Sequence, residues 1–593
     1  MKITALLPVL ACLGRLASAS PTASSSNSYL TKEDPIALKR IMDNIGPNLG
    51  ASPGIVVASP STEDPNYLYT WTRDAALTVK SLVDRVAAGS DKNLISTIEA
   101  YIKVQGALQH IPNISGNFSD LSGLGEPKFN INATEFTGSW GRPQRDGPAL
   151  RATAFVAYGN YALKHGNSAF VTKTLWPILK NDLDYVTKYW NLTGYDLWEE
   201  TMGSSFFTIG ASYRALTEGA KFASKLGHSS SSYVNQAENV LCYLQSFWDK
   251  SSNAIDADIA NGGIMRVVDS GTTVGIIHGF DYKAGCDATT FQPCSDRALA
   301  HHYNLVSTFR PLYPLNNGKT VGEAVAIGRY AYDVYYSGNP WYLTTLAAAE
   351  QLYDALYVWK RQGNLEITDI SLDFFSQFGI HVKTGTYKSS SSTFKHLVTN
   401  IEKYADGFVE IVAKYTPSDG RLHEQFSGWN GTAVSAKDLT WSYASVLTTK
   451  AAKGGSVPAS WGATSIKVPH GKCKFGPEHT VNNDIIDVKF SITDTNLTSS
   501  FGTSNIYVVG NISELGGWST SAAVELHGVS DSYGLFSTII KLPPSTAFEY
   551  KFIEKLNCDE APVTWENYPG GGNREAKTPS KGSLTLPKAT FEY

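Results

Sequence analysis

The spacing of apolar residues changes once along the chain, and this change constrains the fold more than any other feature. From about residue 30 to about 455, apolar residues recur at intervals of three and four, as in Ala76, Val79, Val83 and Val86. After Asp484 they alternate with polar residues, as in Val488, Phe490 and Ile492. The first pattern is typical of amphipathic helices and the second of half-buried strands. The sequence therefore predicts a mostly α domain followed by a separate all-β domain.

The domain boundaries follow from the same change. Residues 20–454 contain helical patterns separated by long loops rich in Gly, Pro, Asn and Trp, with few strand-like runs. Residues 455–483 show little periodicity and are rich in Gly, Pro, Ser and Lys, which indicates a short linker. Residues 484–593 contain short alternating runs between turn residues, a pattern typical of a β-sandwich of about 100 residues.

The N-terminus predicts export. Lys2 precedes an apolar run from Ile3 to Leu13, and Ala17-Ser18-Ala19 provides a small-residue cleavage site, so we expect residues 1–19 to be a signal peptide. The apolar run is too short to span a bilayer, and we expect no association with a membrane. The expectation of a secreted, extracellular glycoprotein agrees with the Asn-x-Ser/Thr sequons at Asn113, Asn117, Asn132, Asn191, Asn430, Asn496 and Asn511.

Charge and cysteine content limit the possible ligands. The net charge of −4 provides no basic surface that would bind nucleic acid. No Cys-x-x-Cys pair or histidine cluster indicates a metal, and we expect no cofactor. His301 and His302 are expected at the surface. Removal of Cys12 with the signal leaves five cysteines, of which Cys286 and Cys294 frame a short polar loop and form the simplest predicted disulfide.

Five segments of the first domain combine polar and aromatic residues at high density. They are Tyr67 to Asp74 (YLYTWTRD), Trp140 to Pro148 (WGRPQRDGP), Asp196 to Glu200 (DLWEE), Gly328 to Trp341, and Leu422 to Phe426 (LHEQF) with Leu439 to Tyr443 (LTWSY). A plain hydrophobic core does not need this density, and loops on a rigid scaffold often hold functional groups.

These segments contain the groups that glycoside hydrolysis requires. One carboxyl must donate a proton to the leaving oxygen, and a second must activate water or attack the sugar. Glu199 lies beside Trp198 and Glu200, and a dry setting or a neighbouring negative charge would raise its pKa. Glu424 is distant in sequence and could approach the sugar from the opposite face. Taken alone, however, Trp-Glu-Glu also fits a solvated helix end, and Arg73-Asp74 fits a helix-start ion pair.

Other hydrolase chemistries have less support. His423-Glu424 is not a zinc motif, because Ser427 stands where a second histidine would be needed. No Gly-x-Ser-x-Gly elbow indicates a serine hydrolase.

Taken together and in order, these segments resemble the fungal glucoamylases of glycoside hydrolase family fifteen. The strings WGRPQRDGPALR (Trp140 to Arg151), GNPWYL (Gly338 to Leu343) and LTWSYA (Leu439 to Ala444) carry the resemblance. It implies an (α/α)6 barrel whose loops form a funnel that admits only a chain end. It further implies an exo-acting, inverting hydrolase that releases β-D-glucose from non-reducing ends of starch, glycogen and maltooligosaccharides, with slower α-1,6 cleavage. The two carboxyls of an inverting enzyme lie about 6.5–9.5 Å apart.

The resemblance also implies a role for each matching residue. Glu199 falls on the general acid and Glu424 on the general base. The residues that fall on substrate-binding positions are Tyr67, Trp71, Arg73, Asp74, Trp140, Arg142, Leu197, Trp198, Glu200, Arg329, Trp341 and Trp441. Among these, Arg73, Asp74 and Arg329 would hold the terminal glucose, and Glu200 would bind the next sugar.

The C-terminal domain resembles the starch-binding domain of carbohydrate-binding family twenty. Asn505 to Gly510 (NIYVVG), Leu515 to Trp518 (LGGW) and Phe548 to Phe552 (FEYKF) carry the match, with Val563 to Glu566 (VTWE). The resemblance implies that Trp518, Trp565 and Lys551 form one starch site and that Tyr507 belongs to a second. Phe536 stands where the family often has Trp, so we expect a weaker second site. The family also pairs Cys242 with Cys473 and Cys286 with Cys294, which leaves Cys558 without a partner.

Two other functions are compatible with this fold. The chain could be a non-catalytic carbohydrate-binding protein, although it retains both Glu199 and Glu424. It could also be an (α/α)6 hydrolase of another α-glucoside, such as trehalose or isomaltose. A starch-binding domain favours a starch hydrolase, because tethering to granules helps only an enzyme whose substrate is there. We expect a monomer whose ligands are maltooligosaccharides and raw starch granules.

Overall fold

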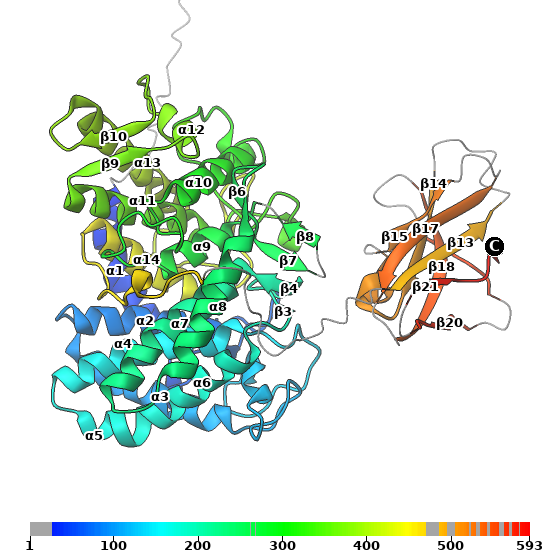
Figure 1. The fold of residues 1–593 in the computed structure, drawn as a ribbon, viewed down its shortest axis with the longest axis horizontal. Helices are drawn as coiled ribbons and strands as arrows, with labels where there is room; N and C mark the ends of the chain where they lie inside the picture. The colour runs from blue at the N-terminus through cyan, green and yellow to red at the C-terminus, as the bar shows by residue number, and fades with distance from the viewer. Residues whose placement is uncertain are drawn as a thin grey trace, which may run out of the picture. The chain divides into compact units, whose positions relative to one another are not determined.

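A computed structural model describes residues 26–260, 263–266, 268–469, 486–494, 504–520, 523–528, 534–542, 546–556, 563–568, 572–579 and 582–592. The chain forms two compact units, residues 1–474 and 475–593 (Figure 1). The predicted signal peptide and residues 470–483 of the predicted linker lie outside the described residues. No helix of the described residues is both long enough and apolar enough to cross a membrane.

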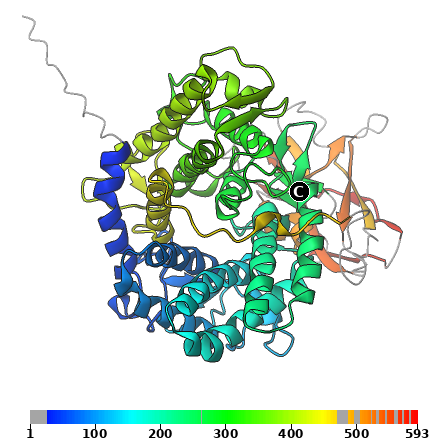
Figure 2. The ribbon, with the colours of Figure 1, turned by 60° about the vertical axis from the view of Figure 1, so that its left-hand side comes forward.

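Six helices of the first unit, counted within the described residues, form an inner ring. They are α2 (Thr72–Ala87), α4 (Asp146–Lys164), α7 (Phe206–Lys225), α9 (Ser270–His278), α11 (Tyr342–Gln362) and α14 (Thr440–Lys453). Each helix packs against the next, and α14 packs against α2, so the ring is closed (Figure 2). These helices are buried on most faces; α11, for example, is buried almost continuously from Tyr342 to Leu356.

Six further helices in the described part of the chain surround this ring. They are α1 (Ser26–Asp43), α3 (Ile95–Gln109), α6 (Trp176–Tyr189), α8 (Ser231–Leu244), α10 (Asp296–Phe309) and α13 (Ser392–Tyr415). Inner and outer helices alternate along the sequence, which is the topology of an (α/α)6 barrel. The outer helices are amphipathic: α13 buries Phe394, Leu397, Ile401 and Ala405 at helical spacing and leaves its other face to solvent. The predicted fold class of the first domain is confirmed.

The prediction that His301 and His302 lie at the surface is wrong. Both side chains are fully buried on α10. The ring of His301 contacts the carbonyl of Asp269 and the ring of His302 contacts the amide oxygen of Gln351. Burial lowers the pKa of each imidazole to about 4, so both are neutral core residues. Their position on the inward face of an amphipathic helix, rather than their polarity, decided where they lie.

The second unit is a β-sandwich. One sheet has the order β16 (His527–Gly528), β17 (Leu535–Leu542), β13 (Ile486–Thr493), β21 (Ser583–Thr585), with β22 (Ala589–Thr590) also paired to β13. The other has the order β15 (Val524–Glu525), β14 (Ser504–Gly510), β18 (Ala547–Leu556), β19 (Thr564–Trp565), with β20 (Arg574–Lys577) also paired to β18. Val488, Phe490 and Ile492 from one sheet share a core with Phe548 and Phe552 from the other, as their alternation predicted.

The segment after α14 packs on the first unit. Trp461 and Ala463 are buried, and the carboxylate of Asp281 accepts hydrogen bonds from the backbone N–H groups of Gly462 and Ala463 at 2.6 and 2.9 Å. The predicted Cys286–Cys294 disulfide is present. Cys473, the predicted partner of Cys242, and Cys558 lie outside the described residues.

Candidate active site

The N-terminal ends of the inner helices meet at one end of the barrel, together with the loops that precede them. Trp71 ends strand β1 (Tyr69–Trp71) and is the residue before α2, so Arg73 and Asp74 occupy the first turn of that helix. Trp341 precedes α11 in the same way, and Trp441 lies in the first turn of α14. Residues from distant parts of the sequence are therefore brought to one end of the ring.

A cavity of about 590 Å³ opens at this end. Its lining includes Tyr67, Trp71, Arg73, Asp74, Trp140, Leu197, Trp198, Glu199, Glu200, Arg329, Trp341, Glu424 and Trp441. With the exception of Arg142, these are all the residues that the sequence predicted for catalysis or substrate binding in this domain. The volume is in the range typical of small-ligand sites, and the mixture of aromatic walls with a few polar groups is equally typical.

Arg142 does not line the cavity. Its Nε donates to both carboxylate oxygens of the buried Glu126, at 2.7 and 2.8 Å, and its terminal nitrogens donate to the carbonyls of Phe136 and Gly138. Arg142 therefore holds together the loop that carries Trp140. The sequence placed it near the site but could not show which way its side chain points.

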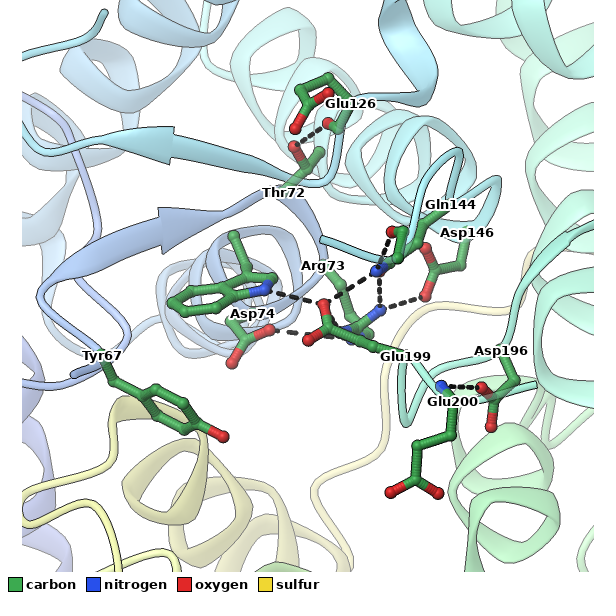
Figure 3. Close-up of polar contacts among 12 residues, drawn as sticks. Tyr67, Thr72, Arg73, Asp74, Glu126, Gln144, Asp146, Asp196, Glu199 and Glu200 are labelled. Carbon is green, nitrogen blue, oxygen red and sulfur yellow. Dashed lines mark hydrogen bonds and ion pairs between the residues drawn. The ribbon is translucent and has the colours of Figure 1, made fainter. Parts of the chain in front are cut away.

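Glu199 lies in the loop between β3 (Gly194–Tyr195) and β4 (Met202–Ser205). Its Oε1 accepts hydrogen bonds from Trp71 Nε1 at 2.8 Å, from Gln144 Nε2 at 2.9 Å and from Arg73 Nη2 at 3.2 Å (Figure 3). Its φ of +66° lies in the left-handed region, which a non-glycine residue occupies at a cost of about 1–3 kcal/mol. Within the described residues, all hydrogen bonds of this carboxyl reach Oε1, so Oε2 can carry a transferable proton.

Arg73 connects several carboxylates beneath Glu199. Its Nη1 donates to Gln144 Oε1 at 2.7 Å and to Asp146 Oδ2 at 2.9 Å, and its Nε lies 3.7 Å from Asp74 (Figure 3). Burial lowers the pKa of this guanidinium, but the surrounding carboxylates outweigh that effect and raise it. Burial raises the pKa of Asp74 to about 6, against the charge of Arg73. The arrangement fixes the directions of both side chains toward the cavity.

Glu424 precedes a two-stranded hairpin, β11 (Gln425–Phe426) and β12 (Ala433–Val434), whose register brings Ser435 opposite it. Ser435 Oγ and Gln425 Nε2 both donate to Glu424 Oε2, at 2.5 and 2.9 Å. Burial raises the pKa of this carboxyl to about 7, while the hydrogen bonds from Ser435 and Gln425, the charge of Arg329 and a hydrogen bond from Tyr67 oppose the increase.

Arg329 is held by carboxylates on two sides. It donates to both oxygens of Asp333, and its Nη2 lies 2.8 Å from Glu200 Oε1. Tyr330 donates to the other oxygen of Glu200. The guanidinium of Arg329 also lies 5.5 Å from the centre of the Trp198 ring and 5.6 Å from that of Trp341. The two carboxylates and the aromatic rings therefore hold the guanidinium of Arg329 in a fixed orientation.

Aromatic rings form most of the cavity wall. The ring centroids of Trp71 and Trp140 lie 5.7 Å apart, and those of Trp198 and Trp341 lie 5.5 Å apart, in edge-to-face contacts. The indole N–H of Trp198 donates to Asp269, which also caps α9. Rings locked in this way provide flat apolar surfaces for the C–H faces of sugars.

Lys128 and Tyr335 are among the lining residues that the sequence did not predict as site residues. Lys128 comes from β2 (Lys128–Asn130), which pairs with β1, and its Nζ lies 3.4 Å from the centre of the Trp140 ring. Burial lowers its pKa to about 8. The hydroxyl of Tyr335 lies 2.8 Å from that of Tyr67. Tyr335 belongs to the segment Gly328 to Trp341 but no pattern distinguishes it within that segment, and only the β1–β2 pairing could have pointed to Lys128.

In the second unit, Trp518 and Trp565 approach each other with ring centroids 6.5 Å apart, and 40% of Trp565 is exposed. Lys551 lies on β18 and Tyr507 on β14, where the Nζ of Lys555 lies 4.0 Å from the centre of the Tyr507 ring. The two tryptophans thus lie close together. The ring of Tyr507 contacts Lys555, which is not among the residues predicted for the starch sites.

Known proteins resemble the chain along nearly its whole length. The model of Glycosyl hydrolases family 15 matches residues 35–451, and that of the Starch binding domain matches residues 485–587. A glucoamylase-1 from Schizophyllum commune is 48% identical over 97% of this chain and 98% of its own length. A glucoamylase from Neurospora crassa is 47% identical over 92% and 91%. The solved structure of a family 15 glucoamylase from Hypocrea jecorina is 43% identical, with a TM-score of 0.73 over 96% of this chain and all of that chain.

Proposed function

The chain belongs to glycosyl hydrolases family 15, and from that premise we propose that it releases β-D-glucose from the non-reducing ends of starch, glycogen and maltooligosaccharides, with slower cleavage of α-1,6 bonds. One observation carries this proposal at the level of the site: two buried or half-buried carboxyls, Glu199 and Glu424, line a single aromatic cavity together with Arg73, Asp74 and Arg329. Inverting hydrolysis needs two such carboxyls, one on each side of the bond to be cut.

We assign Glu199 as the general acid and Glu424 as the general base. A general acid needs a carboxyl oxygen that can hold a proton toward the leaving group, and Glu199 Oε2 meets this need because the donors reach Oε1. A general base must be ionised, and the hydrogen bonds from Ser435 and Gln425 stabilise the ionised form of Glu424.

One observation favours the exchanged roles. Burial raises the pKa of Glu424 to about 7, which is the property of an acid, whereas Glu199 accepts hydrogen bonds from three donors, including a guanidinium. We give the hydrogen-bond directions more weight, because the donors Ser435 and Gln425 and the charge of Arg329 all stabilise the ionised form of Glu424.

Leaving-group dependence separates the two assignments. Glu199→Gln should lower maltose turnover by about 10²–10⁴-fold. The same variant should largely retain hydrolysis of α-D-glucosyl fluoride, because fluoride leaves without protonation. Glu424→Gln should lose activity on both substrates. The opposite pattern would exchange the roles, and near-normal maltose turnover in either variant would refute the site. The anomer released by the unmodified enzyme, followed by NMR, tests inversion: initial α-glucose would contradict it.

Arg73, Asp74 and Arg329 would bind the terminal glucose, and Glu200 the following sugar, while Tyr67, Trp71, Trp140, Leu197, Trp198, Trp341 and Trp441 would form the walls. Arg142 would act indirectly, through the loop of Trp140. In the second unit Trp518, Trp565 and Lys551 would form one starch site and Tyr507 a second. The exported, glycosylated form of the chain would act as a monomer on starch granules, as its N-terminal pattern and sequons favour.

A further inference from the structure

A second cavity lies at the other end of the barrel, distant in the fold from the proposed active site. Its volume is about 640 Å³, and all six inner helices contribute to its lining, which includes Asp84, Arg214, His278, Glu350 and Lys450. Residues 456–459 also line it, and Figure 2 shows the chain after α14 (yellow) crossing the ring of helices. Nothing in the proposed reaction uses this rear cavity.

Two carboxylates in the rear cavity lack a counter-cation. Glu350 and Asp354 are one turn apart on α11, so their side chains share a face. Glu350 Oε2 accepts hydrogen bonds from the hydroxyls of Thr448 and Thr449. Asp354 is 3% exposed and, within the described residues, forms no hydrogen bond or ion pair. Burial raises the pKa of both carboxyls, and the charge of Glu350 raises that of Asp354 further.

The cations of the rear cavity are already paired with other carboxylates. Lys80 binds Asp84 at 2.6 Å and Arg214 lies 3.4 Å from Glu218. The carboxylate of Asp34 forms ion pairs with Arg85, at 2.6 Å, and with Lys450, at 3.0 Å. His278 remains neutral, because burial and then the charges of Arg214 and Lys80 lower its pKa to about 3. No cation of the lining is therefore left for Glu350 and Asp354.

From these contacts we infer that the rear cavity is a second binding site, and that it takes a small organic cation of the alkylammonium class, whose ammonium groups pair with Glu350 and Asp354. Leu77, Phe207, Ile277 and Leu447 provide apolar walls for the alkyl part.

A bare metal ion fits the rear cavity poorly. Among the described residues, no group of three or more His, Cys, Asp or Glu side chains is arranged to hold a metal. The cavity is also far larger than an ion and is largely apolar. An anion would find no free counter-cation in the lining, because Lys80, Arg85, Arg214 and Lys450 are already paired with carboxylates.

Calorimetric titration with 1,4-diaminobutane tests the inference, with butane-1,4-diol and glucose as neutral controls. We expect the diamine to bind and each control to bind at least about tenfold more weakly, because a hydrogen bond to a charged group is stronger than one between neutral groups. Asp354→Asn and Glu350→Gln should each lower the affinity for the diamine by about tenfold or more. Glu199→Gln should leave this binding unchanged, which separates the rear cavity from the active-site cavity.

A third variant blocks the rear cavity without altering its carboxylates. A Cβ added at Gly210, on α7, meets no atom within 4 Å, and Gly210 lines the rear cavity. The leucine side chain of Gly210→Leu should therefore fill part of this cavity and weaken binding of the diamine. We expect maltose kcat/KM to be unchanged in Asp354→Asn and Gly210→Leu. Unchanged activity would show that both variants are folded. Unchanged diamine affinity in both variants, or equal binding of butane-1,4-diol or glucose, would overturn the inference.

Discussion

At the scale of single residues, the proposed catalytic roles depend on the hydrogen bonds that Glu199 and Glu424 accept. At Glu199 the donors reach Oε1, and at Glu424 both Ser435 and Gln425 donate to Oε2. The environments differ in kind, since a guanidinium contacts Glu199 whereas Ser435 and Gln425, which donate to Glu424, are neutral.

Removing the hydroxyl at Ser435 should shift the pH dependence of the enzyme. Ser435 stabilises the ionised form of Glu424, so Ser435→Ala should raise the pKa of Glu424. If Glu424 is the base, kcat/KM falls as pH decreases through that pKa, and the acid limb should therefore move to higher pH.

The pH profile of kcat/KM on maltose measures this shift. Ser445→Ala is the matched control, because Ser445 donates to the carbonyl of Ser442 and does not contact Glu424. An acid limb that stays in place in Ser435→Ala would remove Glu424 from the role of base.

At the scale of elements, buried ion pairs fasten inner helices to outer ones. Arg151 on α4 donates to both carboxylate oxygens of Asp182 on α6, and Gln109 at the end of α3 donates to Asp182 as well. Asp182 is fully buried and Arg151 is 3% exposed. These contacts hold three helices at the side of the barrel and lie outside both cavities.

Asp182→Asn should destabilise the first unit strongly. It leaves the guanidinium of Arg151 buried without an anion, at a cost of about 3–5 kcal/mol. Asp43→Asn breaks the exposed Lys39–Asp43 pair and should change stability by no more than about 1 kcal/mol. The free energy of unfolding from urea denaturation measures both, and equal losses would mean that the buried pair contributes no more than the exposed one.

At the scale of the whole molecule, catalysis and granule binding would reside in separate units. Each unit has its own hydrophobic core, and the two family models match separate residue ranges. A change in one unit should therefore leave the function of the other intact.

Replacing Trp518 and Trp565 together by Ala should reduce adsorption to starch granules by about tenfold or more, if each ring contributes about 1 kcal/mol. Maltose hydrolysis should be unchanged. Trp429→Ala is the control, because Trp429 is 79% exposed but belongs to the first unit. Unchanged adsorption in the double variant would take the granule-binding role away from this pair.

Local patterns in the sequence were sufficient for the fold class and for most of the residues around the active-site cavity. Periodicity reports which face of an element is buried, and it therefore predicted a mostly helical domain and a β-sandwich, whereas the barrel was implied by the resemblance to the family. The motifs around Trp71, Glu199 and Glu424 are continuous in sequence and carry the resemblance to the family. The roles of these residues came from that resemblance, because no spacing distinguishes an acid from a base.

Only the tertiary structure decided which residues meet. It turned Arg142 toward Glu126, brought Lys128 and Tyr335 to the active-site cavity and buried His301 and His302. It also left Asp354 without a hydrogen-bond or ion-pair partner among the residues that the structure describes. The physical reason is that the direction of a side chain and its counter-charge depend on how helices distant in sequence pack together. Sequence spacing constrains neighbours within one helix or strand, whereas ion pairs and cavities form between elements.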